Sequence, residues 1–257
     1  MKSYSRQIVI KIILKWVKKN HKWLNDNCIY DKKAKNKTNI SILKDHNYAK
    51  MESLNLTFQK QLIENCFKNY LNKSQSQLIN ELGVQVNGNV PKNVNNLIIK
   101  KIINQIPDFQ KEHFVIKSIR TQSNNLKESL SFNQINYCEI LNENWEDTAL
   151  YKTLNKEFLF AVFTMDPNNK DAFLLSKILF WKMNLYDLEF VYRFWEHTKE
   201  TIKKGEYDNF ITLKNDFICH VRTKGKNNQD VLITPQNTFQ PKRSFWLNAK
   251  YIYNQLF

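Results

Sequence analysis

Asp108 and Lys117 flank a short apolar run in the stretch "IPDFQKEHFVIK". Hydrolysis of a phosphodiester with Mg²⁺ needs hard oxygen ligands near the scissile phosphate. A lysine beside those ligands can orient water and offset developing charge. Because residues two apart on a strand share a face, a second carboxylate should stand at position 115, which is Val115. The pattern predicts a degenerate nuclease strand with one ligand missing, and therefore no metal site here.

Other acids could supply the missing ligand. Glu112 precedes the expected strand on the wrong alternation, Glu139 ends the next expected strand, and Glu64 lies on an amphipathic helix. Each is also an ordinary type of surface or capping acid. An active Mg²⁺-dependent endonuclease with a displaced carboxylate therefore stays an alternative.

Cations and amides gather in the C-terminal part of the chain. His220, Arg222 and Lys224 alternate along an expected strand and so share one face. The following stretch, "GKNNQD", is an expected exposed loop that carries Lys226, Asn227, Asn228 and Gln229. Arg and Lys pair with guanine edges in the major groove of DNA, and Asn and Gln pair with adenine. Backbone and phosphate contacts are expected from Thr234, Gln236, Lys242 and Arg243.

The whole chain is basic, with 39 Lys and Arg against 24 Asp and Glu and a net charge of +15. Such a surplus favours polyanionic partners. Residues 1–50 alone hold 13 Lys and Arg and three acids. A structural or dimerisation module whose charge is incidental remains the other alternative.

Zinc sites and membrane spans are not indicated. The four cysteines form no Cys-x-x-Cys pair and the five histidines form no cluster. The most apolar segment, "IVIKIILKWV", is short and carries Lys11 and Lys15, which is typical of an amphipathic helix. We expect an intracellular, reducing, cytoplasmic location in a bacterium, with no membrane partner.

Hydrophobic periodicity places these residues on elements. A helical period favours helices over residues 5–24, 56–71, 74–83, 90–106, 146–154, 187–204 and 244–257, with Ser74 or Ser76 capping the third and Trp246 anchoring the last. Strand patterns cover residues 113–120, 131–140, 156–165, 173–183 and 216–224, and residues 31–50 look like a polar connector. The order predicts an α/β (α+β) domain with a mixed sheet flanked by helices.

The tail "HVRTKGKNNQDVLITPQNTFQPKRSFWLNAKYI" resembles the C-terminal part of MutH-type GATC endonucleases. Three earlier stretches then follow the family's order: "QLIENCF", "PDFQKEHFVIKSI" and "WEDTALYKTL". The resemblance covers roughly residues 55–257. It puts Glu64 at the family's helix carboxylate and Asp108 and Lys117 on its Asp…Glu-x-Lys strand. It also puts Lys152, after a one-residue gap in the match, at the lysine of the family's Trp-Glu helix.

The chain looks like the C-terminal MutH-like domain of a Sau-type GATC-specific type II restriction endonuclease. The resemblance implies the restriction-endonuclease fold and binding of double-stranded GATC DNA without cleavage. It also implies an effector role for a catalytic MutH-like domain elsewhere in the same chain. Mg²⁺ is expected in that copy, and no cofactor is expected in this one. Residues 1–54 would be a basic helix and connector, and residues 55–257 the MutH-like domain.

Overall fold

The computed structural model describes residues 39–86, 93–107, 109–122, 125–126, 128–227 and 229–257, with side chains from residue 54 onward except 170 and 171. The helix expected over residues 5–24, and the residues Asp108 and Asn228, lie outside the described part. The chain divides into two compact units, Met1–Asn55 and Leu56–Phe257. The second unit holds every described strand.

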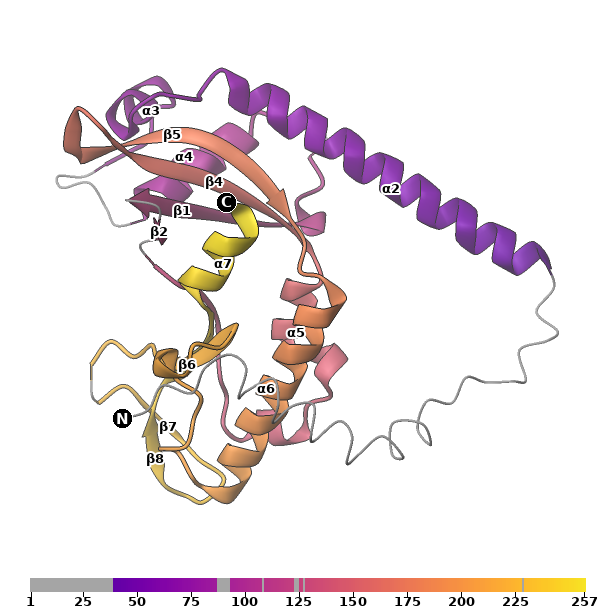
Figure 1. The fold of residues 1–257 in the computed structure, drawn as a ribbon, viewed down its shortest axis with the longest axis vertical. Coiled ribbons are helices and arrows are strands. Elements are labelled where there is room, and N and C mark those ends of the chain that lie inside the picture. Colours follow the sequence, from indigo (N-terminus) through magenta and orange to yellow (C-terminus); the bar gives the residue numbers. More distant parts are fainter. Residues whose placement is uncertain (1–38, 87–92, 108, 123–124, 127, 228) are drawn as a thin grey trace. The chain divides into compact units, whose positions relative to one another are not determined.

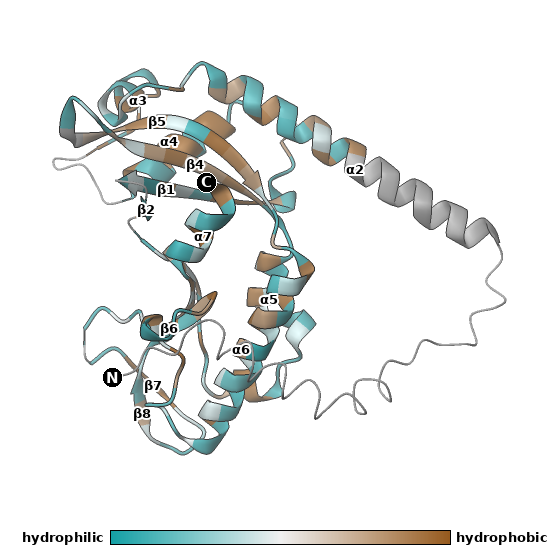
Figure 2. Ribbon diagram, viewed as in Figure 1, coloured by the Kyte–Doolittle hydropathy of each residue, from teal (hydrophilic) through white to brown (hydrophobic). Residues whose placement is uncertain are grey.

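A four-stranded mixed sheet in the order β2-β1-β4-β5 forms one part of the second unit (Figure 1). β1 (Phe114–Gln122) and β4 (Glu157–Asp166) are parallel, whereas β5 (Asn169–Trp181) is antiparallel to β4 and β2 (Asn125–Leu126) is antiparallel to the end of β1. Residues 157–163 of β4 are buried, as the continuous apolar run predicts, and Figure 2 shows the hydrophobic residues of this sheet.

Two helices and the C-terminal part of a third cover one face of this sheet. They are α3 (Gln75–Glu81), α4 (Val94–Ile103) and, from Leu56 onward, α2 (Asn39–Lys68). Ile63, Leu78 and Ile98 on these helices are fully buried in one cluster with Leu159 of β4. Ser74 caps α3 by accepting a hydrogen bond from the backbone N–H of Gln77. Because α2 begins at residue 39, the predicted connector over residues 31–50 is wrong from that residue onward.

A second, three-stranded antiparallel sheet has the order β3-β9-β6. Its strands are β3 (Leu130–Gln134), β9 (Arg243–Leu247) and β6 (Cys219–Thr223), and a separate hairpin joins β7 (Val231–Ile233) to β8 (Phe239–Pro241). The remaining helices are α5 (Ala149–Leu154), α6 (Leu185–Lys204) and α7 (Ala249–Leu256), with short 3₁₀ turns η1 to η4 at Lys111–His113, Glu139–Asn142, Trp145–Asp147 and Leu213–Asn215.

A second hydrophobic cluster joins the other face of the four-stranded sheet to the three-stranded one. Phe158 and Phe160 of β4 lie in it with Phe245 and Leu247 of β9. The predicted apolar stripe of α6 is confirmed, because its members are all buried there: Leu188, Val191, Phe194 and Trp195. The observed architecture confirms the predicted class, a mixed sheet flanked by helices.

Two predicted boundaries are wrong near the site. The strand expected over residues 131–140 ends at Gln134, and Glu139 lies in a 3₁₀ turn. The closing helix expected from residue 244 begins only at Ala249, because the preceding residues pair with β6 as β9. Asn248 caps this helix by accepting a hydrogen bond from the backbone N–H of Lys250.

The described helices and cysteines bear on membrane insertion and on disulfide formation. Within the described part, no helix combines the length and the apolar character that crossing a membrane requires. Cys66, Cys138 and Cys219 are free thiols.

Candidate nucleic-acid interface

β1 carries Val115 and Lys117 on the same face of the four-stranded sheet. Val115 pairs in register with Phe158 and Lys117 with Phe160, and both phenylalanines belong to the cluster between the two sheets. Val115 itself packs against that cluster. An apolar side chain with apolar neighbours therefore occupies the position of the expected carboxylate. Val115 and Lys117 are both half-buried.

The candidate replacement acids do not gather on this face. Glu64 is exposed on α2, whose buried residues pack on the opposite face of the sheet, so the sheet separates it from Lys117. Glu112 is exposed in η1, before β1 begins. Glu139 lies in η2, where its charge acts on the neighbouring Glu143.

Magnesium does not fit the described residues of this face. The described part of the chain contains no group of three His, Cys, Asp or Glu side chains that could hold a metal ion. Beside Lys117 stand an apolar Val115 and the cation Lys224, whose charge lowers the pKa of Lys117 after the larger effect of burial. Hard cations need several oxygen ligands, and a second cation opposes them.

Val115→Glu is the direct probe of the missing ligand. The new carboxylate would share the face of Lys117 and follow Asp108 in the chain, so we expect Mg²⁺ to raise the melting temperature of this variant and not of the natural protein. Loss of the valine packing should lower stability by about 1–2 kcal/mol without metal. Val115→Gln, which lacks the charge, serves as the control in the same thermal scans. Equal Mg²⁺ stabilisation of the natural protein would contradict the absence of a metal site.

The polar face of the three-stranded sheet is built around Trp246. Its partner across the ladder is His220, and the two rings stack with centroids 6.5 Å apart. The Arg222 guanidinium carbon lies 5.3 Å from the centre of the Trp246 ring, and the Lys224 Nζ lies 5.9 Å from it. The indole therefore positions two cations on one side of the sheet.

Lys224 is exposed, but its side chain has a partner within the protein. Its Nζ donates a hydrogen bond of 2.9 Å to the carbonyl of Phe132, which lies on the far strand β3. Its backbone N–H continues the ladder by donating to the carbonyl of Lys242. The hydrogen bond to Phe132 restricts the ammonium group, so less entropy is lost when it meets an anion.

Three neighbouring residues carry buried polar atoms that have no hydrogen-bond partner among the described residues. These atoms are both ring nitrogens of His220, Oγ of Ser244 and Nε1 of Trp246. Burial lowers the pKa of His220, and the charge of Arg222 lowers it further. The lowered pKa favours the neutral form of His220, whose buried ring stacks on Trp246, whereas the sequence grouped it with the cations Arg222 and Lys224 as a DNA contact.

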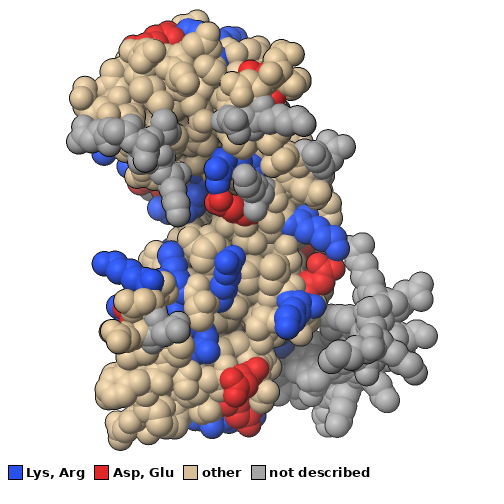
Figure 3. All heavy atoms as spheres, turned by 90° about the vertical axis from the view of Figure 1, so that its left-hand side faces the viewer, with Lys and Arg blue, Asp and Glu red and all other residues tan. Residues whose placement is uncertain are grey.

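Lys117 lies on β1 and Lys224 directly follows β6, yet their side chains interact. Burial lowers the pKa of Lys117, and the charge of Lys224 lowers it further. Figure 3 shows Lys and Arg side chains gathered in the middle of one face of the molecule, around a hollow in its surface. A shared anion would relieve the repulsion between such cations.

The loop after β6 is exposed and internally ordered where it is described. Asp230 accepts hydrogen bonds from Lys242 and from the backbone N–H of Lys226, and these bonds lower the pKa of its carboxyl. The Asn227 Oδ1 accepts a hydrogen bond of 3.0 Å from the backbone N–H of Gln229. The loop thus presents the side chains of Lys226, Asn227 and Gln229 to solvent.

Other predicted contact residues have partners within the protein. Thr234 is buried and its hydroxyl bonds to Thr238, while Gln236 Nε2 donates to the carbonyls of Ile202 and Lys203 at the end of α6. The Arg243 guanidinium donates to the Tyr137 hydroxyl. Lys152 is exposed on α5, 4.0 Å from an oxygen of Asp147. The structure therefore brings together Lys117, Arg222 and Lys224, and gives Thr234, Gln236 and Arg243 internal contacts.

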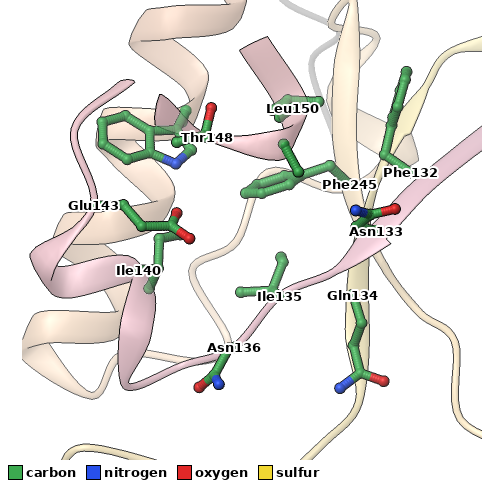
Figure 4. A pocket seen from close by; sticks show the side chains of 12 residues that line it. Phe132, Asn133, Gln134, Ile135, Asn136, Ile140, Glu143, Thr148, Leu150 and Phe245 are labelled. Atoms are coloured by element: carbon green, nitrogen blue, oxygen red, sulfur yellow. The ribbon is translucent and has the colours of Figure 1, made fainter. Parts of the chain in front are cut away.

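A small pocket lies beside β3 (Figure 4). Its volume of about 50 Å³ is lined by Phe132, Glu143 and Trp195 among others. Burial raises the pKa of Glu143, and the charge of Glu139 raises it further. A space of this size holds a few water molecules and excludes a nucleotide.

Sequence reasoning missed the role of Trp246, which was expected to anchor a helix. Phe245 and Leu247 lie in the core, whereas Ser244 and Trp246 belong to the other face of β9, where Ser244 is also buried. The letters "SFWL" do not alternate between polar and apolar, so the local sequence offered no signal for a strand.

No family model matches the chain. The chain is similar to the type II restriction enzyme Sau3AI of Staphylococcus aureus, with 27% identity over an alignment of 273 residues that covers 84% of this chain and 54% of that enzyme. It thus spans about half the length of this relative. The similarity supports a restriction-endonuclease relationship.

Proposed function

We propose that this chain is a sequence-specific binding domain for double-stranded DNA that contains GATC, and that it does not cleave DNA itself. The observation that carries the proposal is the convergence of Lys117, Arg222 and Lys224 beside a strand without a second carboxylate. Fixed cations at the meeting of two sheets suit a phosphate backbone.

We assign the recognition of bases to Arg222 and to the loop that follows β6. An arginine fork pairs bidentately with guanine, and amide side chains pair with adenine. GATC contains both purines, and the loop offers Asn227 and Gln229 beside Lys226. The resemblance of this tail to MutH-type endonucleases supports the same assignment.

The partner we propose is a catalytic MutH-like domain of the same protein, which would use Mg²⁺. The similarity to a restriction enzyme about twice as long supports this arrangement. Binding of GATC at this domain would then activate or position the catalytic domain, provided that DNA binds the active state more tightly.

A gel-shift assay tests the central claim. We expect a GATC duplex to bind at least ~30-fold more tightly than a duplex with the tetranucleotide scrambled, because each lost base pair contact costs about 1–3 kcal/mol. Incubation of the same protein with GATC DNA and Mg²⁺ should leave the DNA intact.

The three possible failures are distinct. Equal affinity for both duplexes would remove sequence specificity. Cleavage that disappears in Lys117→Ala would show an active nuclease with a displaced acid. Absence of DNA binding even at low salt would favour the alternative of a structural or dimerisation module.

A further inference from the structure

A second and larger pocket opens where the four-stranded sheet meets α7. Its volume is about 590 Å³, within the range of small-molecule sites. Thr121 and Thr164, near the ends of β1 and β4, line it with Tyr253 and Phe257 of α7. Ligands favour the carboxyl ends of parallel strands in α/β sheets. Thr121 follows Lys117 on the same face of β1, although the pocket uses none of the cations assigned to DNA.

Hydrogen bonds join a row of hydroxyl groups in the lining, and all of these bonds run in one donor-to-acceptor direction. The Ser176 hydroxyl donates a hydrogen bond of 3.1 Å to the carbonyl of Val162, so its oxygen must accept from Thr164, 2.8 Å away. The Thr164 oxygen must then accept from Thr121, at 3.0 Å. Because each hydroxyl has one proton, the row ends with unused acceptor lone pairs at Thr121. Ser176 lies where the register between β4 and β5 shifts, a feature common beside binding sites.

Another part of the lining is aromatic and lies beside a cation. Tyr253 and Phe257 stack with ring centroids 4.9 Å apart, and the Lys177 Nζ lies 4.1 Å from the centre of the Phe257 ring. Phe257 is about half exposed, at 49%, so a ligand that displaces the Lys177 ammonium group can reach its ring. The carboxylate of Asp166 also lines the pocket and adds a second acceptor.

We propose that this pocket binds a single nucleotide with an amino-bearing base. The base would lie against Tyr253 and Phe257, because aromatic side chains stack on nucleobases. Its amino group would donate to Thr121 or Asp166, and its phosphate would meet Lys177. The nucleotide is either a free mononucleotide or an unpaired nucleotide of DNA, since both present the same chemistry.

Calorimetric titration of the full chain with AMP tests the site, with ribose 5-phosphate as the probe that lacks a base. AMP should bind and ribose 5-phosphate should not. Phe257→Ala should weaken AMP binding about tenfold through lost stacking. Thr164→Val, which breaks the hydroxyl row at constant shape, should weaken it about fivefold.

Matched controls exist for both kinds of change. Phe190→Ala removes a phenylalanine of similar exposure, 45%, on α6 and should leave AMP affinity unchanged. Lys177→Met should remove the preference for AMP over adenosine, whereas Lys156→Met, at the other end of β4, should keep it. Circular dichroism verifies that each variant is folded.

A second arm distinguishes the two sources of the nucleotide. A duplex with one extrahelical 2-aminopurine should lose fluorescence on binding if the unpaired base enters the aromatic pocket, and Phe257→Ala should abolish that change. Binding of this duplex without binding of AMP assigns the site to DNA, and binding of AMP assigns it to free nucleotides.

The proposal is overturned if neither probe binds, if ribose 5-phosphate binds as well as AMP, or if Phe190→Ala and Phe257→Ala behave alike. The gel-shift result with fully paired GATC DNA does not depend on these residues. Failure of the pocket and failure of the proposed function are therefore separable.

Discussion

Arg222→Ala is expected to lower affinity for GATC DNA about 30-fold while affinity for a scrambled duplex falls only a few-fold, because one bidentate contact with guanine contributes about 2 kcal/mol of discrimination. The guanidinium lies over Trp246, which holds the fork on the polar face of β6. Gel-shift titration of both duplexes measures the ratio of the two affinities.

Two further variants separate the fork from its charge. Arg222→Lys keeps the charge and loses the bidentate geometry, so it should lose specificity almost as fully as alanine. Arg193→Ala is the control, because Arg193 is engaged with Glu189 on α6 and should leave both affinities unchanged. Equal losses on the two duplexes in Arg222→Ala would reduce Arg222 to a phosphate contact.

Raising the salt concentration from about 50 to 200 mM is expected to weaken DNA binding about 150-fold. That figure follows from about four phosphate contacts, each of which adds about 0.9 to the slope of log affinity against log salt concentration. Lys117 and Lys224 are the best-placed contributors, because they meet from two sheets.

Lys117→Met should reduce that slope by about one and lower affinity for all duplexes alike. The control is Lys203→Met, since Lys203 is exposed on α6 beside Glu200. Fluorescence anisotropy at several salt concentrations gives the slope for each variant. If Lys117→Met leaves the slope unchanged, Lys117 does not contact the DNA.

Local patterns predicted most of the fold. The β1 and β4 strands, the α6 stripe and the Ser74 cap depend on periodicity or on neighbouring residues, and these predictions are confirmed. The prediction for residues 244–247 failed because β9 exists through pairing with β6, which is distant in the chain. Strand pairing is a tertiary effect that a local helical pattern cannot reveal.

The candidate site was predictable only in part. Alternation correctly put Lys117 on the face of Val115, but it could not show that Lys224 approaches from another sheet. It also put His220 on one face with Arg222 and Lys224, but it could not show that stacking on Trp246 and burial remove the histidine from solvent. Contacts between distant elements decide both cases.

The proximity of Lys117 and Lys224 makes part of the free protein electrostatically unfavourable. Burial and like charge both disfavour the protonated lysine, so the cost is fully present below the lowered pKa and disappears at pH values above the ordinary lysine pKa. A bound polyanion offsets the like-charge part of this cost as it occupies the interface. DNA binding and folding are then coupled, so DNA should raise the melting temperature of the domain. The relief of the repulsion between the two lysines contributes to the affinity for DNA.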